Sequence, residues 1–205
     1  MKHVNKITFV LGIIVISSFL ILYSNINLYA QKDLDLQSFE NNLLFSLQKD
    51  PNNPDLNFDL GLLNKNMGNL ESAYDYFQKV LTITENDSEA LFWSGYILRQ
   101  QNKLGLAASK LEKSLKINPQ NHYAWYELGI INADRTYNEP AISCFIKAAE
   151  YSLNDKKIKE DAIYYIGLLY LNMKNIYKFY YYEKELRSLN PQKADYLKEL
   201  AFLYQ

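Results

Sequence analysis

The sequence contains few of the residues on which common catalytic and metal sites depend. Among its 205 residues there are one cysteine, Cys144, and two histidines, His3 and His122. A single cysteine cannot form an internal disulfide, and no second histidine or cysteine completes a metal site at a usable spacing. The chain also lacks a phosphate-binding glycine loop and a G-x-S-x-G motif. We therefore predict no catalytic residues, no metal site, no cofactor and no enzymatic activity.

The two residues that could be reactive have simple interpretations. We expect His122 to be an ordinary surface residue at the start of a helix. Cys144 precedes the apolar Phe145, so we expect it to act as a small, partly buried hydrophobic residue. The alternative for Cys144 is a reactive or intermolecular thiol.

Glycine (7 residues), proline (5 residues) and excess positive charge are also scarce. Tyrosine (18 residues) and phenylalanine (10 residues) are abundant, and 48% of the chain is hydrophobic. This composition favours helices around a packed core and argues against a disordered or all-β chain. The formal net charge is −1, so a basic face large enough to bind nucleic acid is not expected.

The first 30 residues have the composition of a targeting segment. Lys2, His3 and Lys6 precede an uncharged apolar run from Ile7 to Tyr23, and the next charged residue is Lys32. This pattern predicts a hydrophobic helix that inserts into a membrane, over residues 1–30, as a signal peptide or a transmembrane signal anchor. The positive charges before the run place the N-terminus in the cytoplasm and the rest of the chain outside it.

Two fates of this segment stay open. Cleavage as a signal peptide would occur near Ala30, although Leu28 is larger than the small residue usually found two positions earlier. An uncleaved anchor fits the length of the run better. We therefore expect an exported, membrane-anchored protein with its remaining residues on the non-cytoplasmic side, or a secreted or periplasmic protein if cleavage occurs.

A period of 34 residues organises the rest of the chain. In each period a pair that ends in glycine is followed by an alanine and then by a large apolar residue. The matching positions are Leu60-Gly61, Ala73 and Phe77; Ser94-Gly95, Ala107 and Leu111; and Leu128-Gly129, Ala141 and Phe145. A fixed period of this size, filled by two short helices, predicts an array of stacked helical hairpins.

These three units, 54–87, 88–121 and 122–155, resemble tetratricopeptide repeats, whose pattern is W-x2-L-G-x2-Y, then A-x3-F, then P. A fourth unit, 160–193, keeps Ile166-Gly167 after a four-residue insertion, but has Phe179 in the small-residue column and Glu183 in the aromatic column. Residues 34–53 and 194–205 are predicted to be capping helices at the two ends. The resemblance implies an all-α fold, a right-handed superhelical solenoid of antiparallel helix pairs, preceded here by the N-terminal hydrophobic helix.

The first helix of each unit carries a second stripe of side chains that the hairpin does not use for packing. The resemblance implies that this stripe lines a concave groove in which peptides bind. We call its eleven residues the ladder: Phe58, Leu62, Lys65, Phe92, Tyr96, Arg99, Tyr126, Ile130, Tyr164, Leu168 and Phe202. Most are apolar, which predicts a protein or peptide partner with apolar side chains. The alternative is that side chains of second helices or the N-terminal capping helix fill the ladder.

Two functions are compatible with this organisation. The first is a non-catalytic scaffold that binds a protein segment in the groove. The second is a structural component of an envelope complex that acts by self-association or through the convex face. The identity of the partner and the oligomeric state do not follow from the residues.

Overall fold

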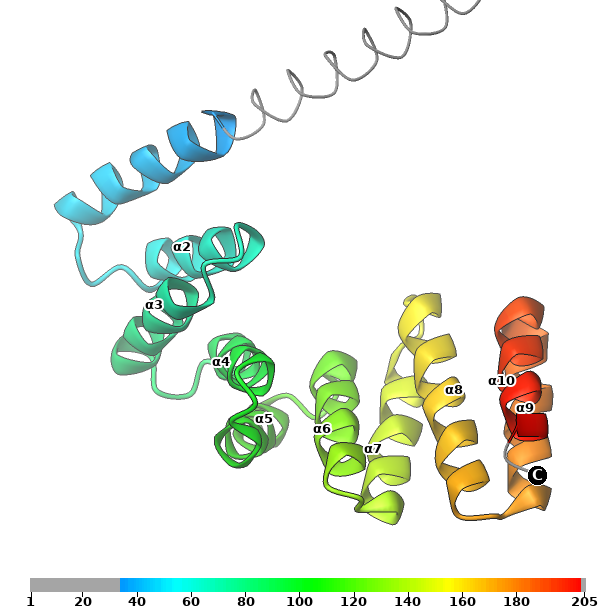
Figure 1. Ribbon diagram of the computed structural model, residues 1–205. Helices are drawn as coiled ribbons and strands as arrows, with labels where there is room; N and C mark the ends of the chain where they lie inside the picture. The colour runs from blue at the N-terminus through cyan, green and yellow to red at the C-terminus, as the bar shows by residue number, and fades with distance from the viewer. Residues whose placement is uncertain (1–33, 204–205) are drawn as a thin grey trace, which may run out of the picture.

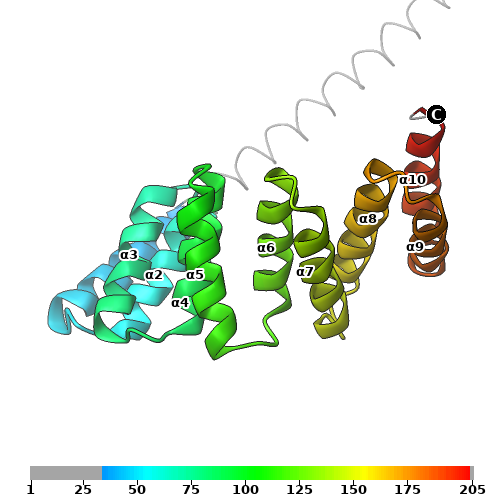
Figure 2. The same ribbon diagram turned by 90° about the horizontal axis from the view of Figure 1, so that it is seen from below.

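The computed structural model describes residues 34–203, and every regular element within them is an α-helix. The helices form antiparallel pairs that follow one another along a curved row (Figure 1). The view from below shows partners such as α6 and α7 lying side by side (Figure 2). The all-helical solenoid predicted from the 34-residue period is confirmed.

The described chain begins with a helix at residues 34–49 and continues through nine labelled helices. These are α2 (Pro54–Asn66), α3 (Leu70–Ile83), α4 (Ser88–Gln100), α5 (Leu104–Ile117), α6 (His122–Asp134), α7 (Asn138–Tyr151), α8 (Lys156–Asn172), α9 (Ile176–Leu189) and α10 (Pro191–Leu203). The last helix starts at Pro191, three residues before the predicted capping segment, because proline is tolerated in the first turn.

The expected hydrophobic helix at residues 1–30 lies outside the described residues. None of the helices between residues 34 and 203 combines the length and the apolar composition needed to span a bilayer.

The first helices of the first three units begin at the same kind of side-chain cap. The side chains of Asn53, Asp87 and Asn121 accept hydrogen bonds from backbone N–H groups of the following turn, at 3.0, 2.8 and 3.0 Å. Asparagine and aspartate are favoured there because they satisfy an N–H group that has no partner within the helix. The caps recur with the period of the sequence, so the residue just before each unit sets the start of that unit's first helix.

Glycine sets the distance between the two helices of a hairpin. A Cβ atom added at Gly61 would lie 2.7 Å from the ring of Phe77, and one added at Gly129 would lie 2.7 Å from the ring of Phe145. Both rings are fully buried. The hairpins therefore need a residue without a side chain at this position.

The fourth unit closes its hairpin differently. Phe179 is fully buried, whereas Glu183 stands where the other units carry Phe77, Leu111 and Phe145 and accepts a hydrogen bond of 2.9 Å from Arg187 Nε. A Cβ atom added at Gly167 would lie 2.7 Å from Leu197 of α10 rather than against α9. The last helix thus fills the space beside Gly167 that a large apolar side chain of the second helix fills in the other units.

Contacts between units show which helices lie on the inner side of the curve. The first helices touch across units: α4 contacts α6, α6 contacts α8, and α8 contacts α10. Hollows separate the second helices α3 and α5, and likewise α7 and α9. The first helices, which carry the ladder, therefore lie on the concave side.

Candidate functional site

The ladder occupies the first helices and α10, with graded exposure. Nine of its residues are half-buried, Phe92 is buried with 6% of its surface exposed, and Phe202 is 64% exposed. The structure therefore brings the predicted residues onto one side of the solenoid, but not as a uniformly open groove.

Two rings of the ladder, Phe58 and Tyr126, pack against the second helices of their own units. The Phe58 ring lies 5.4 Å from the Phe77 ring, and the Tyr126 ring lies 5.7 Å from the Phe145 ring, both edge to face. Such pairs add stability beyond the area that they bury. Part of each ladder ring is thus used internally, while the remainder faces outward.

Phe92 belongs to the contact between the second and third units. Its ring lies 4.8 Å from that of Trp93 and 6.3 Å from that of Tyr123 on α6. With only 6% of its surface exposed, it offers little area to a ligand. Its main role is to hold two neighbouring units together.

Two aromatic residues that were not predicted from the sequence make important contacts between units. Trp93 stacks on Phe77 of the preceding unit at 6.4 Å, and Tyr165 stacks on Phe145 at 5.1 Å. Each follows a ladder residue directly, at a position where the other two units carry Asp59 and Glu127. The sequence feature that could have identified them is that this position is acidic in two units and aromatic in the other two.

The two predicted basic edges of the groove have partners within the protein. Lys65 Nζ lies 4.0 Å above the Trp93 ring, and Arg99 forms an ion pair with Glu127. Burial raises the pKa of Glu127, while Arg99 acts in the opposite direction. Burial likewise lowers the pKa of Lys65. Both cations therefore already interact with side chains of the protein itself.

Two tyrosines of the ladder, Tyr126 and Tyr164, stay protonated at neutral pH. Burial raises the pKa of Tyr126, and the neighbouring Tyr165 raises it further. Burial also raises the pKa of Tyr164, with Tyr196 adding to the effect. Their hydroxyl groups can therefore act as hydrogen-bond donors to a peptide.

A hollow of about 460 Å³ lies where α2 and α4 begin, and Phe58 is the ladder residue that lines it. Acidic side chains surround it, including Asp55, Asp87 and Glu89. Four other hollows are lined by residues outside the ladder. The concave side thus carries an acidic hollow near its N-terminal end.

The two residues that could be reactive, Cys144 and His122, contact neighbouring side chains in ways that favour a structural role. Cys144 is buried, and burial raises the pKa of its thiol to about 11. His122 lies 3.7 Å from Asp155, to which Tyr123 donates a hydrogen bond of 2.6 Å. Between residues 34 and 203, no group of three or more His, Cys, Asp or Glu side chains is arranged to hold a metal ion.

Comparison with known proteins agrees with this repeat architecture. Residues 54–87 and 88–121 each match the model of the tetratricopeptide repeat family. Human tetratricopeptide repeat protein 7A is 29% identical over 90 residues, which are 44% of this chain and 10% of that protein. The chain thus matches only about a tenth of the length of that relative.

Solved structures share the fold over most of the chain. MamA from Desulfovibrio magneticus RS-1 has a TM-score of 0.68 and 20% identity, covering 83% of this chain and 94% of its own. YrrB, described as a protein with an unusual peptide-binding site, has a TM-score of 0.67 and 19% identity, covering 80% and 84%. At such identities the likeness concerns the fold alone. The family model thus identifies residues 54–87 and 88–121 as tetratricopeptide repeats, and the solved structures show that the fold of such repeats extends over most of the chain.

Proposed function

We propose that this protein is a non-catalytic scaffold that binds a protein or peptide segment along its concave side. The observation that carries the proposal is the row of half-buried apolar side chains at equivalent positions of successive first helices. A half-buried ring can bury its exposed part against an apolar side chain of a partner, which is favourable because apolar surface leaves water. The peptide-binding site described for the fold neighbour YrrB supports this mode of action.

Within the ladder, Tyr96, Ile130 and Leu168 supply the contacts. They are half-buried, and each lies four residues after an aromatic residue of the ladder on the same helix. A central contact of this kind contributes about 1–3 kcal/mol to binding. Tyrosine hydroxyl groups add polar contacts at the edges.

Selection of peptides against the full chain, followed by measurement of affinity, tests the proposal. We expect Ile130→Ser and Tyr96→Ser each to weaken a selected peptide by at least about tenfold, corresponding to roughly 1.4 kcal/mol. Tyr177→Ser is the matched control, since Tyr177 lies on α9 outside the ladder and is 85% exposed. Equal affinities for all three variants would place binding elsewhere.

We also propose that the scaffold acts outside the cytoplasm, held at a membrane by residues 1–30. Lys2 and Lys6 before the uncharged run support this orientation. The mass of the mature protein distinguishes an intact anchor from cleavage near Ala30. Protection of the repeats from added protease in intact cells would contradict exposure at the cell surface. Accessibility in spheroplasts would then distinguish a periplasmic from a cytoplasmic location.

A second candidate function is self-assembly through the two ends of the solenoid. Residues 34–87 carry three lysines and nine carboxylates, a net charge of −6, whereas residues 156–203 have a net charge of +3. Apolar side chains are also exposed near both ends, among them Phe45 at 59% and Phe202 at 64%. A head-to-tail contact would bring these ends together. Sedimentation of the protein over a range of concentrations at low and high salt tests this candidate: a salt-sensitive oligomer supports assembly, and a monomer supports capture.

A further inference from the structure

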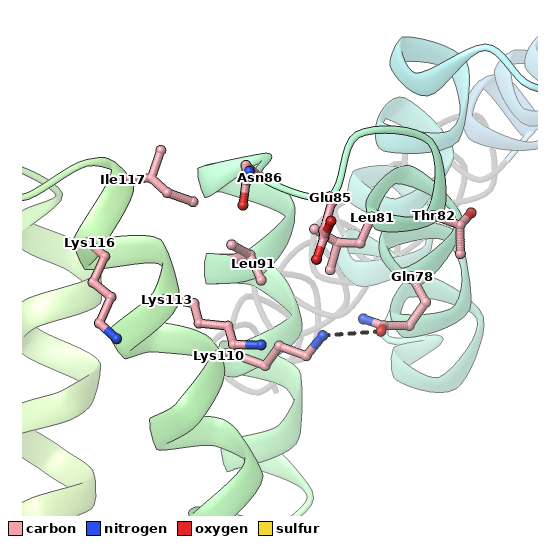
Figure 3. Close-up of a pocket in the computed structure, with 10 residues that line it drawn as sticks. All are labelled: Gln78, Leu81, Thr82, Glu85, Asn86, Leu91, Lys110, Lys113, Lys116 and Ile117. Carbon is pink, nitrogen blue, oxygen red and sulfur yellow. Dashed lines mark hydrogen bonds between the residues drawn. The ribbon is translucent and has the colours of Figure 1, made fainter.

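A hollow of about 500 Å³ lies between the second helices α3 and α5, on the side opposite the ladder. Figure 3 shows three lysines of α5 along one of its walls, Lys110, Lys113 and Lys116, with Glu85 and Gln78 opposite. Residues three apart on a helix share a face, which gathers these three ammonium groups at one site. Glu85 is the one carboxylate that lines the hollow.

The positive charge of this hollow is not neutralised within the described part of the chain. None of the three lysines forms an ion pair there. Lys110 Nζ donates to the neutral Gln78 Oε1 at 3.2 Å, and Gln78 Nε2 donates in turn to the buried Ser94 Oγ at 2.9 Å. Burial lowers the pKa of Lys110, and repulsion from Lys113 lowers it further. An added anion would relieve this repulsion.

Apolar side chains lie beside the lysines. Leu91 is 4% exposed, Leu81 is half-buried and Ile117 is 44% exposed, and all three line the hollow. The corresponding hollow between α7 and α9 is electrostatically balanced, because Lys147 and Lys178 face Glu139 and Glu150. The α3–α5 hollow thus combines an apolar floor with uncompensated positive charge.

The surrounding repeats limit the kind of anion that fits. The unit 88–121 has five basic and two acidic residues, a net charge of +3, whereas the units 54–87 and 122–155 have net charges of −4 and −3. A long nucleic acid or an anionic bilayer would extend past the basic unit and meet these acidic neighbours. A short segment can stay within the basic unit.

We propose that the α3–α5 hollow binds a short acidic peptide segment. Its carboxylates pair with Lys110, Lys113 and Lys116, and an adjacent apolar side chain lies on Leu81 and Leu91. This second site is separate from the ladder, so a partner can contact both sides of the solenoid or two partners can bind at once.

The test measures binding of a fluorescent peptide of alternating glutamate and leucine to the full chain by anisotropy. The peptide with glutamine in place of glutamate serves as its neutral counterpart. We expect Lys113→Glu/Lys116→Glu to weaken binding of the acidic peptide at least tenfold, and the glutamine peptide to bind at least tenfold more weakly to the wild type. Raising the salt concentration should weaken the acidic complex, because salt screens exposed charges.

Lys184→Glu/Lys198→Glu is the matched control, since it makes the same change in net charge at exposed lysines of α9 and α10. We expect this variant to bind within twofold of the wild type. Lys113→Gln provides a milder substitution if the double reversal does not fold, as judged by circular dichroism, and should weaken binding about threefold. Absence of binding to the wild type, equal losses in the target and control variants, or tighter binding of duplex DNA or anionic vesicles than of the peptide would overturn the proposal. Ile130→Ser tests only the ladder and should leave this affinity unchanged.

Discussion

Arg99 and Glu127 join two repeats across the concave side. Arg99 belongs to α4 and donates through Nε to Glu127 Oε2 on α6, 28 positions further along the chain. Glu127 is buried, with 7% of its surface exposed. The arginine that resembled a free edge of the groove therefore stabilises the angle between neighbouring units.

We expect Arg99→Leu to lower the free energy of unfolding by about 1–3 kcal/mol at neutral pH, because it leaves a buried carboxylate without a partner. Since burial already raises the pKa of Glu127, the folded protein binds more protons than the unfolded chain between the two pKa values, and stability falls as pH rises through that window. Loss of Arg99 raises the folded pKa further. The excess loss should therefore begin only where the pH passes the raised pKa of Glu127 in the folded wild type, and should grow from there towards neutral pH.

Urea denaturation at several pH values measures this effect. The double variant Arg99→Leu/Glu127→Gln is the control, because it removes the charge that lost its partner and should show a flatter pH profile than Arg99→Leu. Parallel profiles for the two variants would show that Glu127 does not depend on Arg99.

Two phenylalanines of the ladder should differ sharply in their effect on stability. Phe92→Ala opens a cavity at the contact between two units and should cost about 3–5 kcal/mol. Phe202→Ala removes a ring that is 64% exposed and should change stability by no more than about 0.5 kcal/mol. Thermal or urea unfolding of the two variants makes the comparison, and similar losses would contradict the burial assigned to Phe92.

Gly129→Ala should destabilise the third hairpin, although alanine favours helices. The added Cβ would lie 2.7 Å from the buried Phe145 ring, and overpacking of this kind costs about 1–3 kcal/mol. Gly105→Ala is the control, because the nearest neighbour of its added Cβ is the end of the Arg135 side chain at 3.4 Å. This second change should be neutral or stabilise by up to about 1 kcal/mol. If Gly129→Ala stabilised the protein as much, the close approach of α6 and α7 would be wrong.

The thiol of Cys144 should be inert in the folded protein. Burial raises its pKa to about 11, so its thiolate fraction at pH 8 is smaller by about 200-fold than that of a free cysteine, whose pKa is about 8.5. We expect a thiol-specific disulfide reagent to react at least about 100-fold more slowly with native than with urea-unfolded protein. Fast native labelling would support the alternative of a reactive thiol.

The sequence determined the fold because its information is local and periodic. Glycines such as Gly61 and Gly129 fix the close approach within a hairpin, and caps such as Asn53 and Asn121 fix where first helices start. Each of these interactions joins residues that are at most 16 positions apart, so the 34-residue period carries it directly. The predicted tetratricopeptide architecture is confirmed, whereas the expected membrane helix falls outside the described residues.

Only the tertiary structure decided what happens between units. The burial of Phe92, the stacking of Trp93 and Tyr165 on the preceding repeat, and the contact of Gly167 with Leu197 all depend on the angle at which one hairpin meets the next. That angle results from the combined volumes of side chains that are 16 to 31 positions apart in the chain. No periodic pattern in the sequence encodes such volumes, so the position of a ladder residue was predictable from its repeat, but its exposure was not.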